Sequence, residues 1–150
     1  MKFLRPLTIF MALLAVAGLT LNPSRAGAQS DDQLKMDSIL ARTMASQELL
    51  TEADVIAYLN NLEPIYRLRF EPGRQQETIR NIGVWSEERF AYVITKMASG
   101  LSRLFRPGDP RNNGLADFAR PTPAEEALIR RYQDDLGRAL EAIQVKYPNP

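Results

Sequence analysis

Apolar residues recur at three- and four-residue spacing along most of the chain, which is the periodicity of amphipathic α-helices. The widest apolar stripe begins after Ser86 and consists of Phe90, Val93, Ile94, Met97, Ala98, Leu101, Leu104 and Phe105. Ser86 is a preferred N-cap residue, and the two glutamates that follow it lie where the helix dipole favours negative charge. Trp85 can pack against Phe90 across this cap. The pattern therefore predicts a helix from Ser86 to Phe105.

A second helix start lies at Thr51, where Asp54 stands three residues on as the acidic partner of a capping box. The helical stripe after it consists of Val55, Leu59, Leu62 and Tyr66. Pro64 falls inside this stripe, and proline removes a helical hydrogen bond. We therefore expect the helix either to kink near Pro64 or to stop and start again.

Two weaker helices are predicted on either side of this one. Residues Asp31 to Leu50 have mixed three- and four-residue apolar spacing, with acidic residues at the positive end of the helix. Residues Arg74 to Ile82 can form two helical turns, and Gly83 would end them because glycine readily takes the left-handed conformation.

The last helix has the start signal Thr122-Pro123-Ala124-Glu125, with threonine as N-cap, proline at the first position and glutamate at the third. The apolar stripe that follows runs without a gap to Tyr147. It predicts one continuous helix that ends before Pro148.

A loop rich in proline and glycine joins the last two predicted helices over residues 106–121, and we expect Leu115 and Phe118 to pack it onto the protein. The chain beyond residue 28 has no sustained alternation of period two. We therefore predict an all-α fold in which residues 29–150 form a single helical domain, a small bundle of four principal helices plus one short helix.

Residues 1–28 have the three parts of a Sec signal peptide. Lys2 and Arg5 are followed by an uncharged apolar run of 15 residues, and Ala26 and Ala28 supply the small side chains needed for cleavage before Gln29. The rival interpretation is a membrane anchor, but the run is shorter than the roughly 20 residues that span a bilayer. We predict a bacterial protein that is periplasmic or secreted, without a membrane span after cleavage. It is not a lipoprotein, because the chain has no cysteine.

The chain has no histidine and no cysteine. This excludes serine–histidine triads, cysteine nucleophiles, disulfides and imidazole or thiolate metal sites. An enzyme built on carboxylates alone remains a remote alternative. The oxygen-bearing residues Asp109, Asn112, Asn113 and Asp117 lack EF-hand spacing and are typical of turns. We therefore predict no catalytic residue, no metal site and no cofactor.

The most suggestive polar feature is two groups of arginines. The first group lies in the middle of the chain and consists of Arg67, Arg69, Arg74 and Arg80. The second group lies at the end of the best helix and in the loop after it, and consists of Arg103, Arg106 and Arg111. Five of these are the candidate binding residues: Arg74, Arg80, Arg103, Arg106 and Arg111. If the two groups met in space, they would form a basic patch for phosphate or carboxylate groups. The favoured explanation is structural: neighbouring acidic residues neutralise the arginines, and the dipoles of helix C-termini stabilise them.

The favoured function is an exported, non-catalytic helical protein that binds a protein or an envelope component. The alternative is a binder of an anionic small ligand or polymer that uses the five arginines. A nucleic-acid partner is not expected, because the chain after residue 28 has 16 basic and 18 acidic residues and no nucleic-acid-binding motif. The oligomeric state is left open.

The predicted caps give a first test. Thr122→Ala and Ser86→Ala each remove an N-cap hydroxyl, and each should lower the free energy of unfolding by about 0.5–2 kcal/mol. Urea unfolding of each variant measures this loss. An unchanged midpoint would place the helix start elsewhere.

Overall fold

The computed structural model describes residues 31–148, with side chains from Ser38 onward, and every regular element in this range is helical. The seven α-helices are α2 (Asp31–Ala45), α3 (Glu52–Asn60), α4 (Leu62–Arg67), α5 (Gln75–Ile82), α6 (Glu87–Phe105), α7 (Pro123–Arg131) and α8 (Gln133–Lys146). Three short 3₁₀ helices accompany them: η3 (Pro72–Arg74), η4 (Pro110–Gly114) and η5 (Asp117–Ala119). The all-α prediction is confirmed for this range. The predicted signal peptide and its cleavage residues Ala26, Ala28 and Gln29 lie outside the described residues.

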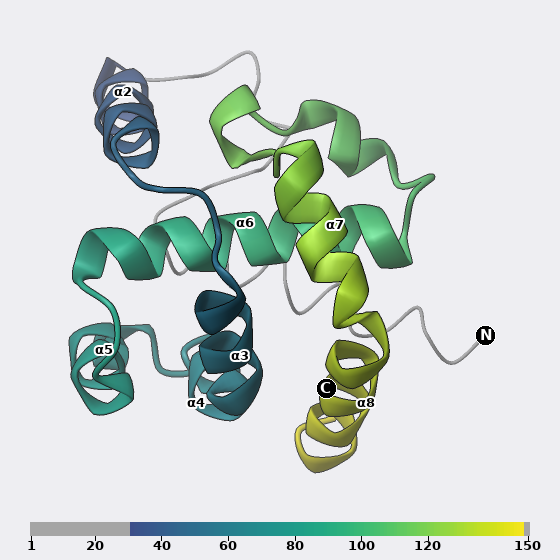
Figure 1. The fold of residues 1–150 in the computed structure, drawn as a ribbon. Helices are drawn as coiled ribbons and strands as arrows, with labels where there is room; N and C mark the ends of the chain where they lie inside the picture. Colours follow the sequence, from purple (N-terminus) through teal and green to yellow (C-terminus); the bar gives the residue numbers. More distant parts are fainter. Residues whose placement is uncertain (1–30, 149–150) are drawn as a thin grey trace.

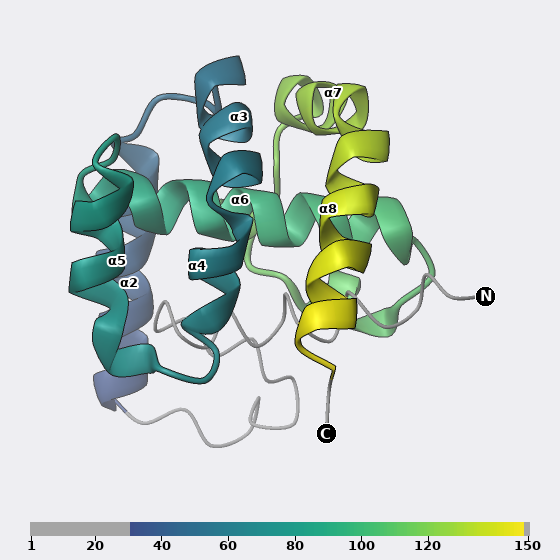
Figure 2. The same cartoon turned by 90° about the horizontal axis from the view of Figure 1, so that it is seen from below.

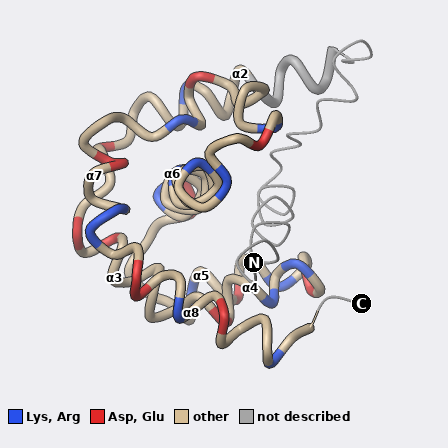
Figure 3. Tube along the Cα trace, turned by 90° about the vertical axis from the view of Figure 1, so that its right-hand side faces the viewer, with Lys and Arg blue, Asp and Glu red and all other residues tan. Residues whose placement is uncertain are grey.

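Helix α6 passes through the middle of the fold, and the other helices are arranged around it (Figures 1 and 3). Every residue from Tyr92 to Ser102 is buried, so three turns of α6 are covered on all sides. On one side lies α2, and on the other α5, the α3–α4 pair and α8 run across α6 in a row (Figure 2). The predicted bundle of four principal helices is not confirmed, because the helices that cover α6 cross it instead of running alongside it.

The hydrophobic core follows from this arrangement, because α2, α3, α5 and α7 pack on α6, while α4 and α8 pack on α3 and on each other. The largest fully buried side chains are Tyr58, Tyr66, Phe90, Ile65, Met97, Leu101 and Ile129. They come from α3, α4, α6 and α7, and they belong to one continuous cluster. The described residues therefore share a single core built around α6.

The three predicted helix starts are confirmed. The hydroxyl groups of Thr51 and Thr122 accept the N–H groups of Asp54 and Glu125, each at 3.2 Å. The two carboxylates accept the N–H of their own cap residue in return, at 2.9 and 3.0 Å. The hydroxyl of Ser86 accepts the N–H three residues further on at 3.1 Å. Trp85 and Phe90 lie 6.1 Å apart between ring centroids.

The predicted interruption near Pro64 is also confirmed, because α3 ends at Asn60 and α4 begins at Leu62. Proline has no N–H to give to the carbonyl four residues before it, so the helix loses a bond at this point. Asn61 stabilises the break, since its side chain donates to the carbonyl of Ala57 at 2.8 Å.

The prediction of one continuous C-terminal helix is wrong, because α7 ends at Arg131 and α8 begins at Gln133. The N–H of Tyr132 bonds to the carbonyl of Ile129, only three residues back. The apolar stripe continues through this break, but its first half packs on α6 and its second half on α3 and α4. One straight helix could not reach both surfaces.

The loop over residues 106–121 contains η4 and η5 and is packed onto the protein as expected. Leu115 is buried, and Phe118 is partly buried against the core. By contrast, α2 ends at Ala45, five residues earlier than predicted. The segment that follows it is held by side chains of α6 and α7, as described below.

The end of α5 tests the predicted stop signal. Gly83 has a φ of +74°, and a Cβ there would approach the carbonyl oxygen of Arg80 to 3.6 Å. Gly83→Ala should lower the free energy of unfolding by about 1–2 kcal/mol, because left-handed backbone is unfavourable for alanine. Gly73→Ala is the matched control, since nothing lies within 4 Å of a Cβ there. It should be neutral or stabilise by about 0.4–1 kcal/mol. Equal urea midpoints for the two variants would contradict this interpretation.

Candidate functional site

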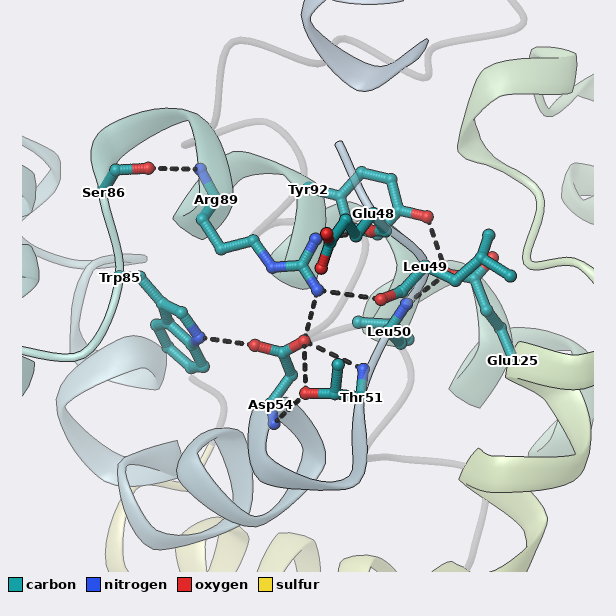
Figure 4. A network of polar contacts seen from close by, with 10 residues as sticks. All are labelled: Glu48, Leu49, Leu50, Thr51, Asp54, Trp85, Ser86, Arg89, Tyr92 and Glu125. Atoms are coloured by element: carbon teal, nitrogen blue, oxygen red, sulfur yellow. Dashed lines mark hydrogen bonds and ion pairs between the residues drawn. The ribbon is translucent and has the colours of Figure 1, made fainter. Parts of the chain in front are cut away.

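The structure has two polar features that could serve a function. One is a network of buried polar residues around α6, and the other is a solvent-connected cavity lined by polar residues at the C-terminal end of α6. The network begins at the carboxylate of Asp54 (Figure 4). One oxygen accepts the indole N–H of Trp85 at 2.9 Å, and the other accepts the N–H of Thr51 and a guanidinium N–H of Arg89. Asp54 therefore closes the cap of α3 and joins α3 to α6.

Arg89 extends the network to the segment between α2 and α3. Its guanidinium donates to the carbonyls of Glu48 and Leu49, and it lies over the ring of Tyr92 at 4.9 Å. These carbonyl contacts replace helical hydrogen bonds, which explains how the chain leaves the helical conformation after α2.

Glu125 forms the second half of the network and is almost fully buried, at 1% exposure. One of its oxygens accepts the N–H of Leu50 at 3.0 Å and the hydroxyl of Tyr92 at 2.8 Å. The ammonium of Lys96 lies 3.7 Å from the other oxygen and donates to the carbonyl of Arg120 at 2.6 Å. Glu125 therefore ties α7 to α6 and to the start of α3.

Hydrogen bonding decides the charge state of both buried acids. Burial by itself raises the pKa of Asp54, but the hydrogen bonds from Arg89, Thr51 and Trp85 outweigh it and hold that pKa below its usual value. Burial likewise raises the pKa of Glu125, and its hydrogen bonds and the charge of Lys96 overcome this effect. Both carboxylates are fully engaged in holding helices together, and neither lines the cavity described next. They therefore give no support to carboxylate catalysis.

The cavity lies between α6, α7 and the loop over residues 106–121, and it has a volume of about 330 Å³. Its apolar wall is formed by Gly100, Leu104, Pro107 and Ile129. Its polar wall is formed by Arg103, Asn112, Asn113, Arg120, Glu126 and Arg130. We call it the arginine cavity, because three of its six polar residues are arginines.

Gly100 allows the two helices of the arginine cavity to approach closely. A Cβ at this position would lie 2.4 Å from the terminal methyl of Ile129, which is far inside contact distance. Glycine inside a strongly apolar helix is the one sequence signal for this close approach. Gly100 marks the point on α6 against which α7 packs.

The cavity arginines are only weakly neutralised. Arg103 forms an ion pair with Glu126 at 3.2 Å, and Arg120 lies 3.8 Å from the fully exposed Asp117. Arg130 has no ion pair with any described residue. Exposed ion pairs contribute little free energy, so an incoming anion competes easily for these guanidinium groups.

Of the five predicted arginines, only Arg103 lines the cavity. Arg106 and Arg111 both contact Asp109, at 3.5 and 2.6 Å, and hydrogen bonds from Arg111 hold the pKa of that carboxyl well below its usual value. Both are therefore occupied within the loop.

The other two predicted arginines lie with η3 and α5, at the opposite end of α6. Arg74 forms ion pairs with Glu71 and Glu77, and Arg80 is exposed on α5. The 19 residues of α6 span about 28 Å. The two predicted groups of arginines therefore do not meet, and the single patch built from all five does not form.

Sequence reasoning missed Arg120 and Arg130. Arg120 lies two residues before the α7 cap residue Thr122, and Arg130 follows Glu126 by one helical turn. Neither lies near Arg103 in the sequence, so only the packing of α7 against α6 brings the three arginines together.

The oxygen-rich loop shows no arrangement for a metal ion. Asp109 is engaged by arginines, and Asn112 accepts the hydroxyl of Ser102 at 2.6 Å and donates to the carbonyl of Arg106 at 2.7 Å. Over the part of the chain that the structure describes, no group of three or more acidic side chains could hold a metal ion.

Comparison with known proteins gives no relative: no family model, no curated protein and no solved structure matches this chain. Among the helices of residues 31–148, none combines the length and apolar character that crossing a membrane requires. The function must therefore be argued from the arginine cavity itself.

The buried network predicts a defined response to acid. Because the pKa of Glu125 is lowered on folding, its contribution is fully present above about pH 4.3 and is lost as the pH falls through the folded value. Glu125→Gln leaves Lys96 without its buried partner and should cost about 3 kcal/mol at pH 7. Urea unfolding at pH 7, 5, 4 and 3 should show this cost shrinking below pH 4.

Glu141→Gln is the matched control, since Glu141 is exposed on α8. It should change the free energy of unfolding by less than about 0.5 kcal/mol at every pH. A cost for Glu125→Gln that stays constant from pH 7 to pH 3 would show that the charge of Glu125 is not what stabilises the fold.

Proposed function

We propose that this protein binds a small anionic ligand in the arginine cavity and performs no catalysis on it. The observation that carries the proposal is the convergence of Arg103, Arg120 and Arg130 on one cavity that contains a single carboxylate, Glu126. Guanidinium groups are suited to carboxylates and phosphates, because their planar N–H donors match two oxygens at once.

The size of the cavity supports this function. A volume of about 330 Å³ lies at the lower end of the range of small-ligand sites. The ion pair that holds Arg103 is partly solvated, with 42% of the arginine side chain and 29% of Glu126 exposed. A bound anion can therefore take the place of Glu126 at little cost.

The residues of the cavity also support binding without chemistry. Neither histidine nor cysteine occurs in the chain, and Glu126 is the one acid that lines the cavity, already paired with Arg103. General acid–base catalysis works with positioned groups that exchange protons near the operating pH, whereas guanidinium groups stay protonated.

We further propose that the protein acts after export through the Sec route, as the features of residues 1–28 predict. The periplasm or the outside of the cell is the compartment that this proposal implies. The ligand would then be a solute or envelope constituent that is present there.

Binding of a protein partner is kept as a broader prediction. Large apolar side chains that are exposed include Ile39, Phe70, Val84 and Val145. Leu49 and Ile56 complete this set, and no helix carries more than one of the six among its described side chains. The structure therefore favours the arginine cavity as the place to test first.

The arginines can be tested by substitution. Arg130→Gln and Arg103→Gln should each weaken the binding of citrate or inorganic phosphate by about 10- to 150-fold, since a charge-assisted hydrogen bond contributes about 1.5–3 kcal/mol. Glu126→Gln should act in the opposite direction and strengthen binding several-fold, because it removes a competing carboxylate. Isothermal titration calorimetry at low and high salt measures all three effects.

Arg138→Gln is the control, because Arg138 is an exposed arginine on α8 that contacts Asp135 and does not line the cavity. It should leave the affinity within twofold. Affinities that are the same in low and high salt, or an Arg138→Gln variant as weak as Arg130→Gln, would refute the proposed function.

A further inference from the structure

The chemistry of the arginine cavity narrows the class of ligand, if the proposed function holds. We infer that the ligand is a hydroxylated anion, a sugar or sugar-like polyol that carries a phosphate or carboxylate group. A bare inorganic anion and an acid with an apolar body both fit the cavity less well, for reasons of volume and of lining.

The volume argues against a bare inorganic anion. The arginine cavity is open to solvent and has a volume of about 330 Å³. A phosphate or carboxylate group has only three to five heavy atoms, so it would engage the arginines and leave most of the cavity filled with solvent. The ligand therefore has a body in addition to its charged group.

The lining shows what kind of body fits. Asn112 and Asn113 add amide groups to the wall, and each amide carries both N–H donors and a carbonyl acceptor. A hydroxyl group both donates and accepts, so it can satisfy these mixed groups. An apolar body would displace water from the amides without replacing the lost hydrogen bonds, which is unfavourable.

The two asparagines differ in how firmly they are held. Asn112 is fixed by its bonds to the hydroxyl of Ser102 and the carbonyl of Arg106. The side chain of Asn113 is exposed in η4 and has no hydrogen-bond partner among the described residues. Asn113 is therefore free to bond to the ligand, and its position next to Asn112 keeps it at the cavity wall.

The apolar wall fits the same ligand. Leu104, which is half-buried, and Pro107, which is exposed, form a small apolar surface beside the arginines. A sugar ring presents C–H groups on its faces and hydroxyl groups around its edge. One face can pack on the two side chains while the edge reaches the asparagines.

Calorimetry with four probes tests the inference: inorganic phosphate, glucose 6-phosphate, glucose and octanoate, each added to the purified protein. Glucose 6-phosphate should bind at least 10-fold more tightly than phosphate, glucose or octanoate. Asn113→Ala should weaken glucose 6-phosphate binding by about 5- to 10-fold and leave phosphate binding within twofold. Asn81→Ala, at an exposed position on α5, is the matched control and should change neither affinity.

The outcomes separate the two proposals. Equal affinities for phosphate and glucose 6-phosphate, or tightest binding of octanoate, would overturn the inference while anion binding itself stands. Absence of binding for all three anions would overturn the proposed function as well. If glucuronate also binds, comparison with a short glucuronate-containing oligosaccharide distinguishes a free sugar acid from a unit of an anionic polysaccharide, and either source supports the inference.

Discussion

The fold depends on the hydrogen bonding of two buried carboxylates, Asp54 and Glu125. An ionised acid away from water is tolerated only when several donors surround it. Each of these acids obtains its donors from two places at once, from its own capping box and from distant parts of the chain. The start of α3 and the start of α7 are therefore fixed to the same central helix, and neither helix can shift along α6 without leaving a charge unpaired.

This constraint also determines where the arginine cavity forms. Lys96, which neutralises Glu125, donates to the carbonyl of Arg120 and so fixes the backbone just before α7. The close approach of Gly100 to Ile129 then sets the spacing of α6 and α7 one turn further along. The cavity opens where the two helices continue past this contact and the loop over residues 106–121 returns. The buried charges of Asp54, Glu125 and Lys96 hold the helices in place, whereas the arginines of the cavity stay exposed to solvent.

What could be predicted from the sequence is what depends on neighbours in the chain. The caps at Thr51, Ser86 and Thr122 and the long stripe of α6 are local patterns, and the structure confirms them. The second role of each capping acid is not local, since Asp54 bonds to a side chain 31 residues away and Glu125 to a backbone 75 residues away.

The break between α7 and α8 at Tyr132 cannot be predicted from the sequence pattern for a related reason. The apolar stripe is unbroken there, and the helix turns only because the two halves of the stripe cover different surfaces. Closeness in the sequence groups Arg103 with Arg106 and Arg111, whereas the fold brings Arg103 together with Arg120 and Arg130.

The composition of the arginine cavity has a consequence for how binding responds to the surroundings. Guanidinium groups stay protonated at any pH at which proteins fold, and the chain has no histidine that could change its charge near neutrality. The contribution of the arginines to the attraction for an anion is therefore nearly independent of pH. It does depend on salt, because the guanidinium groups are partly exposed and mobile ions screen exposed charges within about 10 Å at 0.1 M ionic strength. Under the proposed function and the export predicted from residues 1–28, the pH around the site would follow the medium. The arginines would keep their charge through such changes, whereas histidines would lose theirs.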